Sequence, residues 1–377
     1  FALKRASAEA AWHEPGPAPK PTDPEMKKWL VEIIAMTAMV DPTDPTSIDT
    51  SPASYGHNSL GSNDGRGWGK NPVTHQPYVP HVVPHYDFAR VMAEYWADGP
   101  KSETPPGQWN VLANGVADAP GFERKLFGKG DPLDPLSWDV HTYLALNGAL
   151  HDAAIAAWDV KRRDMSARAI SLIRWMGGKG QSSDPKLPSY DPQGLPLVPG
   201  LVELVTKESS APGERHEGLS FFVGQVALKD WLGEPGDRKH RLSSVGWVRA
   251  VDWTPYQRRT FVAPAYPGFV SAHSALGRSA AEVLATVTGS PYFPGGLFEY
   301  VAPKDTFLTS EKGPSTDVRL QWASYYDASD EAGQSGLYGG VELRPGDLAG
   351  RRIGHAVGLE AMALASKYFD GSAPGKL

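Results

Sequence analysis

One uninterrupted run, residues 137–161, limits most strongly what this chain can fold into. The run SWDVHTYLALNGALHDAAIAAWDVK has the apolar spacing of a long helix, and its small residues allow another helix to pack closely against it. Helical patterns also cover residues 25–39, 86–97, 215–232, 272–288, 317–332 and 346–369. Because the alternating patterns typical of strands are scarce, we expect an all-α protein of packed helical bundles with long structured loops.

Segments rich in proline, glycine and serine separate these helices. Residues 14–24 predict a proline-rich arm, residues 41–86 a long loop or lid, and residues 177–200 a further insertion. We therefore divide the chain into an N-terminal arm, helix and loop over residues 1–85 and a helical domain over residues 86–377.

Composition narrows the classes of function. The net charge of −6 argues against a nucleic-acid-binding surface, and no apolar stretch is long enough to span a membrane. The chain has no cysteine, which excludes disulfides, thiolate metal sites and cysteine nucleophiles. It begins at Phe1, as expected if a signal peptide had been removed, so we expect a secreted or periplasmic protein.

His273 is the first candidate for chemistry. It lies in residues 261–281, where proline and glycine break regular structure before Ser271 and Ala272 open an apolar helix. The start of a helix offers free N–H groups and a positive dipole end, which suit an oxyanion. A histidine there can hold an anion or transfer a proton, although it can also simply cap a buried helix.

Two further stretches offer charged candidates. Lys161 and Arg168 are seven residues apart, so a continuous helix would place both cations on one face, two turns apart, where they could clamp an oxyanion. The alternative is a solvated basic patch, Lys161-Arg162-Arg163. Glu342 stands between Val341 and Leu343, an apolar setting that could raise its pKa and suit acid/base work, whereas the alternative is a surface pair with Arg344.

The order Lys-x6-Arg, then Ser-x-His at a helix start, then a Gly-Gly segment near the C-terminus resembles the vanadium-dependent haloperoxidase and type-2 phosphatidic acid phosphatase superfamily. Segments similar to its bacterial haloperoxidase-like branch are YWADGPKSETPPGQWN, HDAAIAAWDVK, WTPYQRRTFVAPAYPGFVSAHS, SPYFPGG and YGGVELRPGDLAGRRIG, between residues 86 and 365. The resemblance implies an all-α scaffold with an anion site at the end of the bundle.

The resemblance also assigns roles by position. Lys161 and Arg168 match the first anion-binding motif of the superfamily, although Ala169 replaces its usual proline. Ser271 and His273 match the second motif, in which the serine and a glycine N–H bind the oxyanion and the histidine serves as acid/base.

The departures from the family pattern are consequential. Ala272 replaces the glycine of the second motif. In the third motif Ser335 is followed by Gly336 instead of arginine, and Glu342 stands where the superfamily has the histidine that bonds vanadium or becomes phosphorylated. The local charge becomes up to two units more negative, so we predict weak or absent binding of vanadate or phosphate, no phosphohistidine and no other cofactor.

Three functions follow. The first is a diverged hydrolase for a small molecule or saccharide, glycosidic bonds included, with Glu342 and His273 as an acid/base or nucleophile pair. Substrate or anion binding would then fall to Lys161, Arg168, Ser271, Ala272 and Arg344. The second is a vanadium haloperoxidase or phosphatase that tolerates the changes, and the third is a non-catalytic anion-binding protein.

Several subsidiary expectations concern the surroundings of the site. We expect no metal site: His273 and Glu342 would suit a divalent ion, but His141 and His151 lie on opposite helix faces, and His151 is better explained as a core or interface histidine. Aromatic residues that could line a substrate pocket are Trp68, Tyr78, Tyr86 and Trp109, and Gln108 stands where related segments usually have histidine. The resemblance is also compatible with a homodimer.

Overall fold

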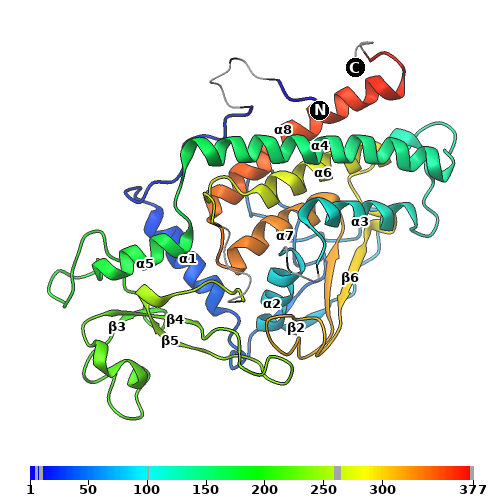
Figure 1. Ribbon diagram of the computed structural model, residues 1–377. Coiled ribbons are helices and arrows are strands. Elements are labelled where there is room, and N and C mark those ends of the chain that lie inside the picture. The colour runs from blue at the N-terminus through cyan, green and yellow to red at the C-terminus, as the bar shows by residue number, and fades with distance from the viewer. Residues whose placement is uncertain (5–6, 8–11, 98, 100–101, 259–264, 374–377) are drawn as a thin grey trace.

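The computed structural model describes residues 1–4, 7, 12–97, 99, 102–258 and 265–373. Three long helices form its main bundle (Figure 1). They are α4 (Pro135–Asp164), α6 (Ala272–Thr288) and α8 (Arg344–Phe369). Helix α4 begins where the side chain of Asp134 accepts a hydrogen bond from the N–H of Ser137, an N-cap followed directly by proline at the first helical position.

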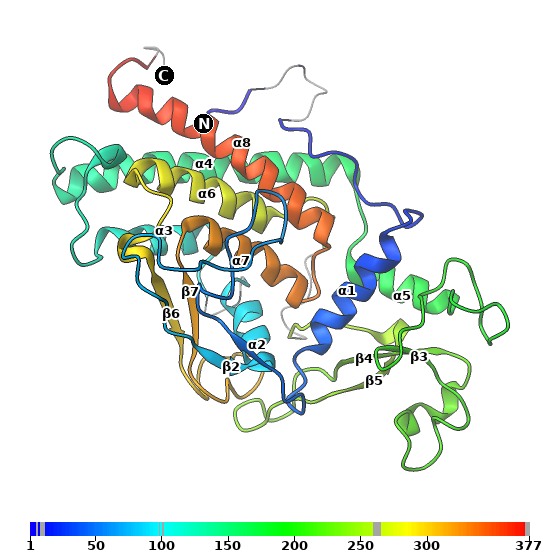
Figure 2. The same cartoon turned by 180° about the vertical axis from the view of Figure 1, so that it is seen from behind.

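Helix α6 is the centre of this bundle. It packs against α4, α8, α7 (Tyr325–Tyr338) and α3 (Pro105–Ala117), as Figures 1 and 2 show from opposite sides. Every residue from Ser274 to Leu284 is buried, because neighbouring helices cover the helix all round. One group of buried polar side chains is hydrogen-bonded within the bundle: Ser274 donates to Asp347, which in turn accepts two hydrogen bonds from Arg351.

A row of glycines brings α8 into direct contact with the backbone of α6. Gly346, Gly350, Gly354 and Gly358 recur every four residues, which places them on one face of α8. A Cβ on Gly350 would lie 2.5 Å from the carbonyl oxygen of Ser271, and one on Gly358 would lie 2.8 Å from that of Ser279. We refer to these four residues as the α8 glycine row; it fixes how closely the two helices approach.

A second layer lies below the long helices in Figure 1 and has its own hydrophobic core. It consists of α1 (Met26–Ala38), α5 (Ala169–Lys179) and an antiparallel sheet of β3 (Val202–Leu204), β4 (Val226–Trp231) and β5 (Val245–Arg249). Two smaller hairpins pair β1 (Ser47–Asp49) with β2 (Val82–Pro84) and β6 (Phe298–Ala302) with β7 (Val318–Trp322). Helix α2 (His85–Tyr95) follows β2, and short 3-10 turns lie at Leu126–Gly128, Glu217–Phe222, Ala250–Asp252 and Pro294–Gly296.

The predicted all-α class is confirmed in its main part, and most predicted helices are present within a few residues. The helix predicted over 215–232 is wrong, because Val226–Trp231 pairs with both neighbouring strands of a sheet. The helix predicted over 317–332 is wrong in its first part, since Val318–Trp322 is strand β7. Among the described residues, none of the helices has the length and apolar character that crossing a membrane requires.

Candidate active site

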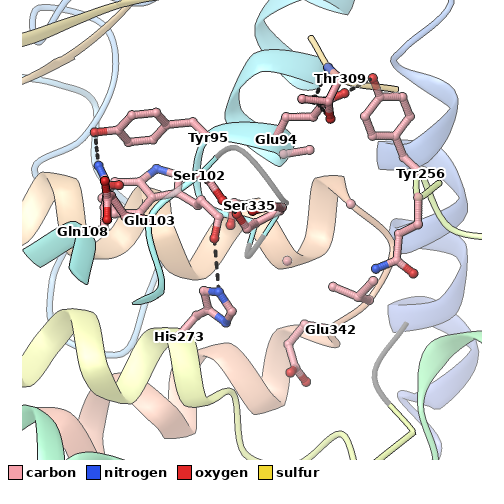
Figure 3. Close-up of a pocket in the computed structure, with 18 of the residues that line it drawn as sticks. Glu94, Tyr95, Ser102, Glu103, Gln108, Tyr256, His273, Thr309, Ser335 and Glu342 are labelled. Atoms are coloured by element: carbon pink, nitrogen blue, oxygen red, sulfur yellow. Dashed lines mark hydrogen bonds between the residues drawn. The ribbon is translucent and has the colours of Figure 1, made fainter. Parts of the chain in front are cut away.

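A cavity of about 410 Å³ opens at the N-terminal end of α6 (Figure 3). Its wall contains six of the seven predicted site residues, Lys161, Arg168, Ser271, Ala272, His273 and Glu342, together with Ser335 and Gly336 of the third motif. The seventh, Arg344, does not line the cavity, because its guanidinium pairs with Glu32 of α1, with Nε 2.8 and 2.9 Å from the two carboxylate oxygens. The structure therefore places Arg344 in a contact between helices.

Glu342 enters the cavity from the tight turn between α7 and α8. Gly340 has a φ of 75°, and the N–H groups of Val341 and Glu342 both donate to the carbonyl of Gly336. The carboxyl is buried, and its Oε1 accepts a hydrogen bond of 3.2 Å from the N–H of Leu343. Burial raises the pKa of Glu342, and the cations of Lys161 and Arg168 oppose that rise. Glu342 is therefore buried beside two cations, and the surface pair with Arg344 is not formed.

Lys161 is buried in the last turn of α4. Its Nζ donates hydrogen bonds of 2.8 Å to the carbonyl oxygens of Pro267 and of Gly268. Burial lowers the pKa of Lys161 to about 8, while the nearby Glu342 carboxyl acts in the opposite direction. Lys161 and Glu342 therefore lie close enough for each to influence the charge of the other.

Arg168 also lines the cavity, but contrary to the prediction it does not lie on the same helix as Lys161. Helix α4 ends at Asp164, Met165 has a φ of 47°, and Arg168 is the extended N-cap residue of α5, so the single helical face expected for the two cations is wrong. Arg168 donates from Nε to the carbonyl of Tyr266 at 2.7 Å and from Nη1 to that of Val341 at 2.8 Å. The break in the helix is what turns Arg168 toward Lys161.

The ring of Tyr266 joins the two cations. Lys161 Nζ lies 5.2 Å from the ring centroid and the guanidinium carbon of Arg168 lies 4.6 Å from it, both within the range of a cation–π interaction. Lys161 is not part of a solvated basic patch, because it is buried and held by the carbonyl groups of Pro267 and Gly268.

Ser271 and His273 have separate tasks at the start of α6. Ser271 is the N-cap: its hydroxyl accepts from the N–H of Ser274 at 3.3 Å, and its own N–H donates to the carbonyl of Gly346 at 3.0 Å. The alternative in which His273 caps the helix is therefore wrong. Nε2 of His273 instead lies 3.1 Å from the carbonyl oxygen of Trp96, the dashed contact in Figure 3.

The aromatic wall of the cavity differs from the predicted one. None of the four aromatic residues named from the sequence lines it, and Trp109 is buried in the core. The wall instead contains Tyr95, Trp96, Tyr256, Tyr266, Phe298, Tyr300 and Phe307. Gln108 does line the cavity, where its amide donates to the hydroxyl of Tyr95.

Glu94 is a lining residue that the sequence analysis missed. Its carboxylate accepts hydrogen bonds from the N–H and hydroxyl of Thr309, from the N–H of Ser310 and from the hydroxyl of Tyr256, and burial raises its pKa. The sequence did indicate this residue, because Glu94 is a charged residue between the apolar residues Ala93 and Tyr95 of α2. Its bonds tie α2 to the segment after β6 and so shape one side of the cavity.

No group of three or more potential metal ligands occurs among the described residues. Nδ1 of His141 lies 2.6 Å from the carbonyl oxygen of Ser137, and His151 has a side chain 64% exposed beside Asp152. The alternative in which His151 is a core residue is therefore wrong.

The chain can be compared with known proteins through this fold and site. A family model described as the VCPO second helical-bundle domain matches residues 223–371. No curated protein sequence matches the chain. The holo-type structure of a bacterial vanadium-dependent chloroperoxidase is 13% identical, with a TM-score of 0.52 over 91% of this chain and 48% of that chain. The apo-type structure is 15% identical, with a TM-score of 0.56 over 95% of this chain and 53% of that chain.

This chain thus spans about half the length of each of these two solved structures. At these identities the structures show a shared fold, while the family model covers the segment that contains Ser271, His273 and Glu342. Residues 223–371 thus resemble the VCPO second helical-bundle domain, and the likeness of the chain to the vanadium-dependent chloroperoxidase structures is one of fold.

Proposed function

We propose that this protein is a diverged enzyme that hydrolyses a small organic or saccharide substrate, with Glu342 and His273 as its acid/base pair. The observation that carries the proposal is the placement of a buried carboxyl, Glu342, beside Lys161 and Arg168 in the cavity that also holds His273. The family pattern has at this position the histidine that bonds vanadium or becomes phosphorylated.

The residues present do not fit vanadate. Lys161 and Arg168 donate four hydrogen bonds to backbone carbonyl oxygens. The positive charges of both side chains also act on the Glu342 carboxyl. A multiply charged oxyanion would add negative charge to a buried site that already contains a carboxyl, at a cost of several kcal/mol (order of magnitude). Gly336, in place of arginine, supplies no compensating charge. We therefore derive no step through vanadate.

Hydrolysis uses the two groups in complementary ways. Glu342, whose pKa burial raises, donates a proton to the leaving-group oxygen as the scissile bond breaks. His273 accepts a proton from the attacking water, whose oxygen forms the new bond to the substrate. The aromatic wall supplies apolar contact for the substrate. The cations of Lys161 and Arg168 stabilise the Glu342 carboxylate that forms when its proton is donated.

The test combines a search for hydrolysis with a search for vanadate. Chromogenic esters and glycosides would be screened with the native protein, and Glu342→Gln and His273→Ala should each lower the rate at least about a hundredfold. Orthovanadate would be titrated by calorimetry, and bromide oxidation by peroxide would be followed in parallel. We expect neither binding nor oxidation for the native protein, and a gain of vanadate binding for the double variant Gly336→Arg/Glu342→His.

Two results would contradict the proposal. Tight vanadate binding with bromide oxidation by the native protein would establish a haloperoxidase that tolerates Glu342. Hydrolysis of no substrate, combined with anion binding that persists in Glu342→Gln, would establish a non-catalytic anion-binding protein.

A further inference from the structure

Trp96 connects His273 of the cavity to a buried carboxyl that does not line it. The carbonyl oxygen of Trp96 lies 3.1 Å from Nε2 of His273, and its indole Nε1 donates a hydrogen bond of 3.0 Å to Oε1 of Glu331. Glu331 lies on α7 and is 1% exposed. One residue therefore contacts His273 with its backbone and a buried anchor with its side chain.

The Trp96 carbonyl is available because of where α2 ends. Helix α2 stops at Tyr95 and Trp96 is its C-cap, so this carbonyl lies beyond the last turn of the helix. A carbonyl oxygen can only accept a hydrogen bond, so Nε2 of His273 must carry the hydrogen. In the neutral imidazole, Nδ1 is then the nitrogen that accepts a proton.

Packing and hydrogen bonding hold Trp96 in one orientation. Its side chain lies among aromatic rings, with centroids 5.0 Å from Tyr95, 5.6 Å from Trp322 and 6.0 Å from Trp109. The bond to Glu331 fixes the rotation of the indole within this cluster. The carbonyl that faces His273 is consequently fixed as well.

We infer that Trp96 and Glu331 are positioning residues that hold neutral His273 as the Nε2–H tautomer, so that Nδ1 exchanges protons with the substrate. Figure 3 shows the second ring nitrogen of His273 on the side of the ring toward Glu342, consistent with this assignment. The catalytic part of the inference rests on the proposed function, whereas the tautomer is a property of the protein alone.

The test is a nitrogen NMR spectrum of the full chain labelled with ¹⁵N-histidine, recorded at a pH where His273 is neutral. The signals of His273 are those that disappear in His273→Gln. The native protein should give the Nε2–H pattern. The double variant Trp96→Phe/Glu331→Leu removes donor and acceptor together, which avoids a buried unpaired group, and should give a mixture of both tautomers.

Glu331→Gln is the matched control, because its amide oxygen can still accept from Trp96 and should preserve the Nε2–H pattern. A native spectrum with the Nδ1–H pattern, or a double variant with an unchanged spectrum at native-like near-ultraviolet dichroism, would overturn the inference. If hydrolysis is found, the double variant should lower kcat about tenfold or more. If no substrate is hydrolysed while the tautomer behaves as described, only the proposed function fails.

Discussion

A Cβ atom on Gly346 would lie 2.5 Å from Oε1 of Glu342. The first turn of α8 thus lacks a side chain at the point where the Glu342 carboxyl lies against it. Glu342 precedes the start of α8, and Gly346 lies in the first turn of that helix. Because Gly346 has no side chain, it leaves the space that the Glu342 carboxyl occupies.

Substituting Gly346→Ala should move the Glu342 carboxyl and lower hydrolysis about tenfold or more, because acid/base geometry tolerates little displacement. The free energy of unfolding should change by about 1 kcal/mol or less, since alanine favours the helix by a similar amount. The matched control is Gly178→Ala on α5, whose nearest contact would be an ordinary 3.5 Å from Val251. Equal activity of the two variants would contradict the role of Gly346.

The buried pair of Lys161 and Glu342 should show strong coupling in a double-mutant cycle. Lys161→Met leaves a buried carboxyl with one cation fewer and should cost about 3 kcal/mol or more in the free energy of unfolding. Adding Glu342→Gln should restore about 1 to 3 kcal/mol of that loss. Urea unfolding at pH 7 measures each value.

Lys229 and Asp41 provide the control pair for this cycle, because they form an ion pair of 2.9 Å in which the lysine side chain is 38% exposed. Their coupling should stay below about 1 kcal/mol. A coupling between Lys161 and Glu342 as small as this would show that the two groups act independently.

Asp230 should make the protein less stable as pH rises. It lies on β4, and burial raises the pKa of Asp230 to about 8. Because the folded state then holds the proton more tightly than the unfolded chain, the stability present below the ordinary pKa is lost as pH rises toward 8. One group contributes at most about 1.4 kcal/mol per pH unit.

Asp230→Asn removes this titration, so its stability relative to the native protein should increase between about pH 4 and pH 8. Asp330 and Glu331, whose pKa values burial raises to about 7, contribute to the same decline in both proteins. Urea unfolding at several pH values measures the difference, and parallel curves for the two proteins would show that Asp230 does not titrate in this range.

The α8 glycine row should be sensitive to a single methyl group. A Cβ on Gly354 would collide with the carbonyl oxygen of Ala275, which is backbone and cannot rotate away. Gly354→Ala should therefore destabilise the protein by about 1 to 3 kcal/mol despite the better helix propensity of alanine. Thermal unfolding beside Gly178→Ala measures this, and equal midpoints would mean that the helices can separate without cost.

The sequence was most informative where periodicity is long or where charged residues follow a known order. Helix α4 was predicted because its pattern persists for many turns, and the association of Lys161 with Arg168 was predicted although the helix between them is broken at Met165. The strands were missed because Val226–Trp231 and Val318–Trp322 are short, mostly buried runs, which cannot be distinguished from helix segments by periodicity.

Contacts between distant segments could not be predicted from one sequence. Arg344 pairs with Glu32, which is 312 residues away, and no local pattern marks that choice. The wall of the cavity depends in the same way on which aromatic residues the tertiary structure brings together. The α8 glycine row, by contrast, was visible as a four-residue spacing in the sequence and would have indicated the close approach of two helices.

That close approach has a consequence for the history of the site. The separation between the start of α6 and the start of α8 is set where backbone meets backbone, so it does not depend on the side chain at position 342. During evolution the reactive group at position 342 can therefore be replaced while Ser271 and His273 keep their positions. One scaffold can in this way pass from one chemistry to another through single amino-acid replacements, without rebuilding its frame.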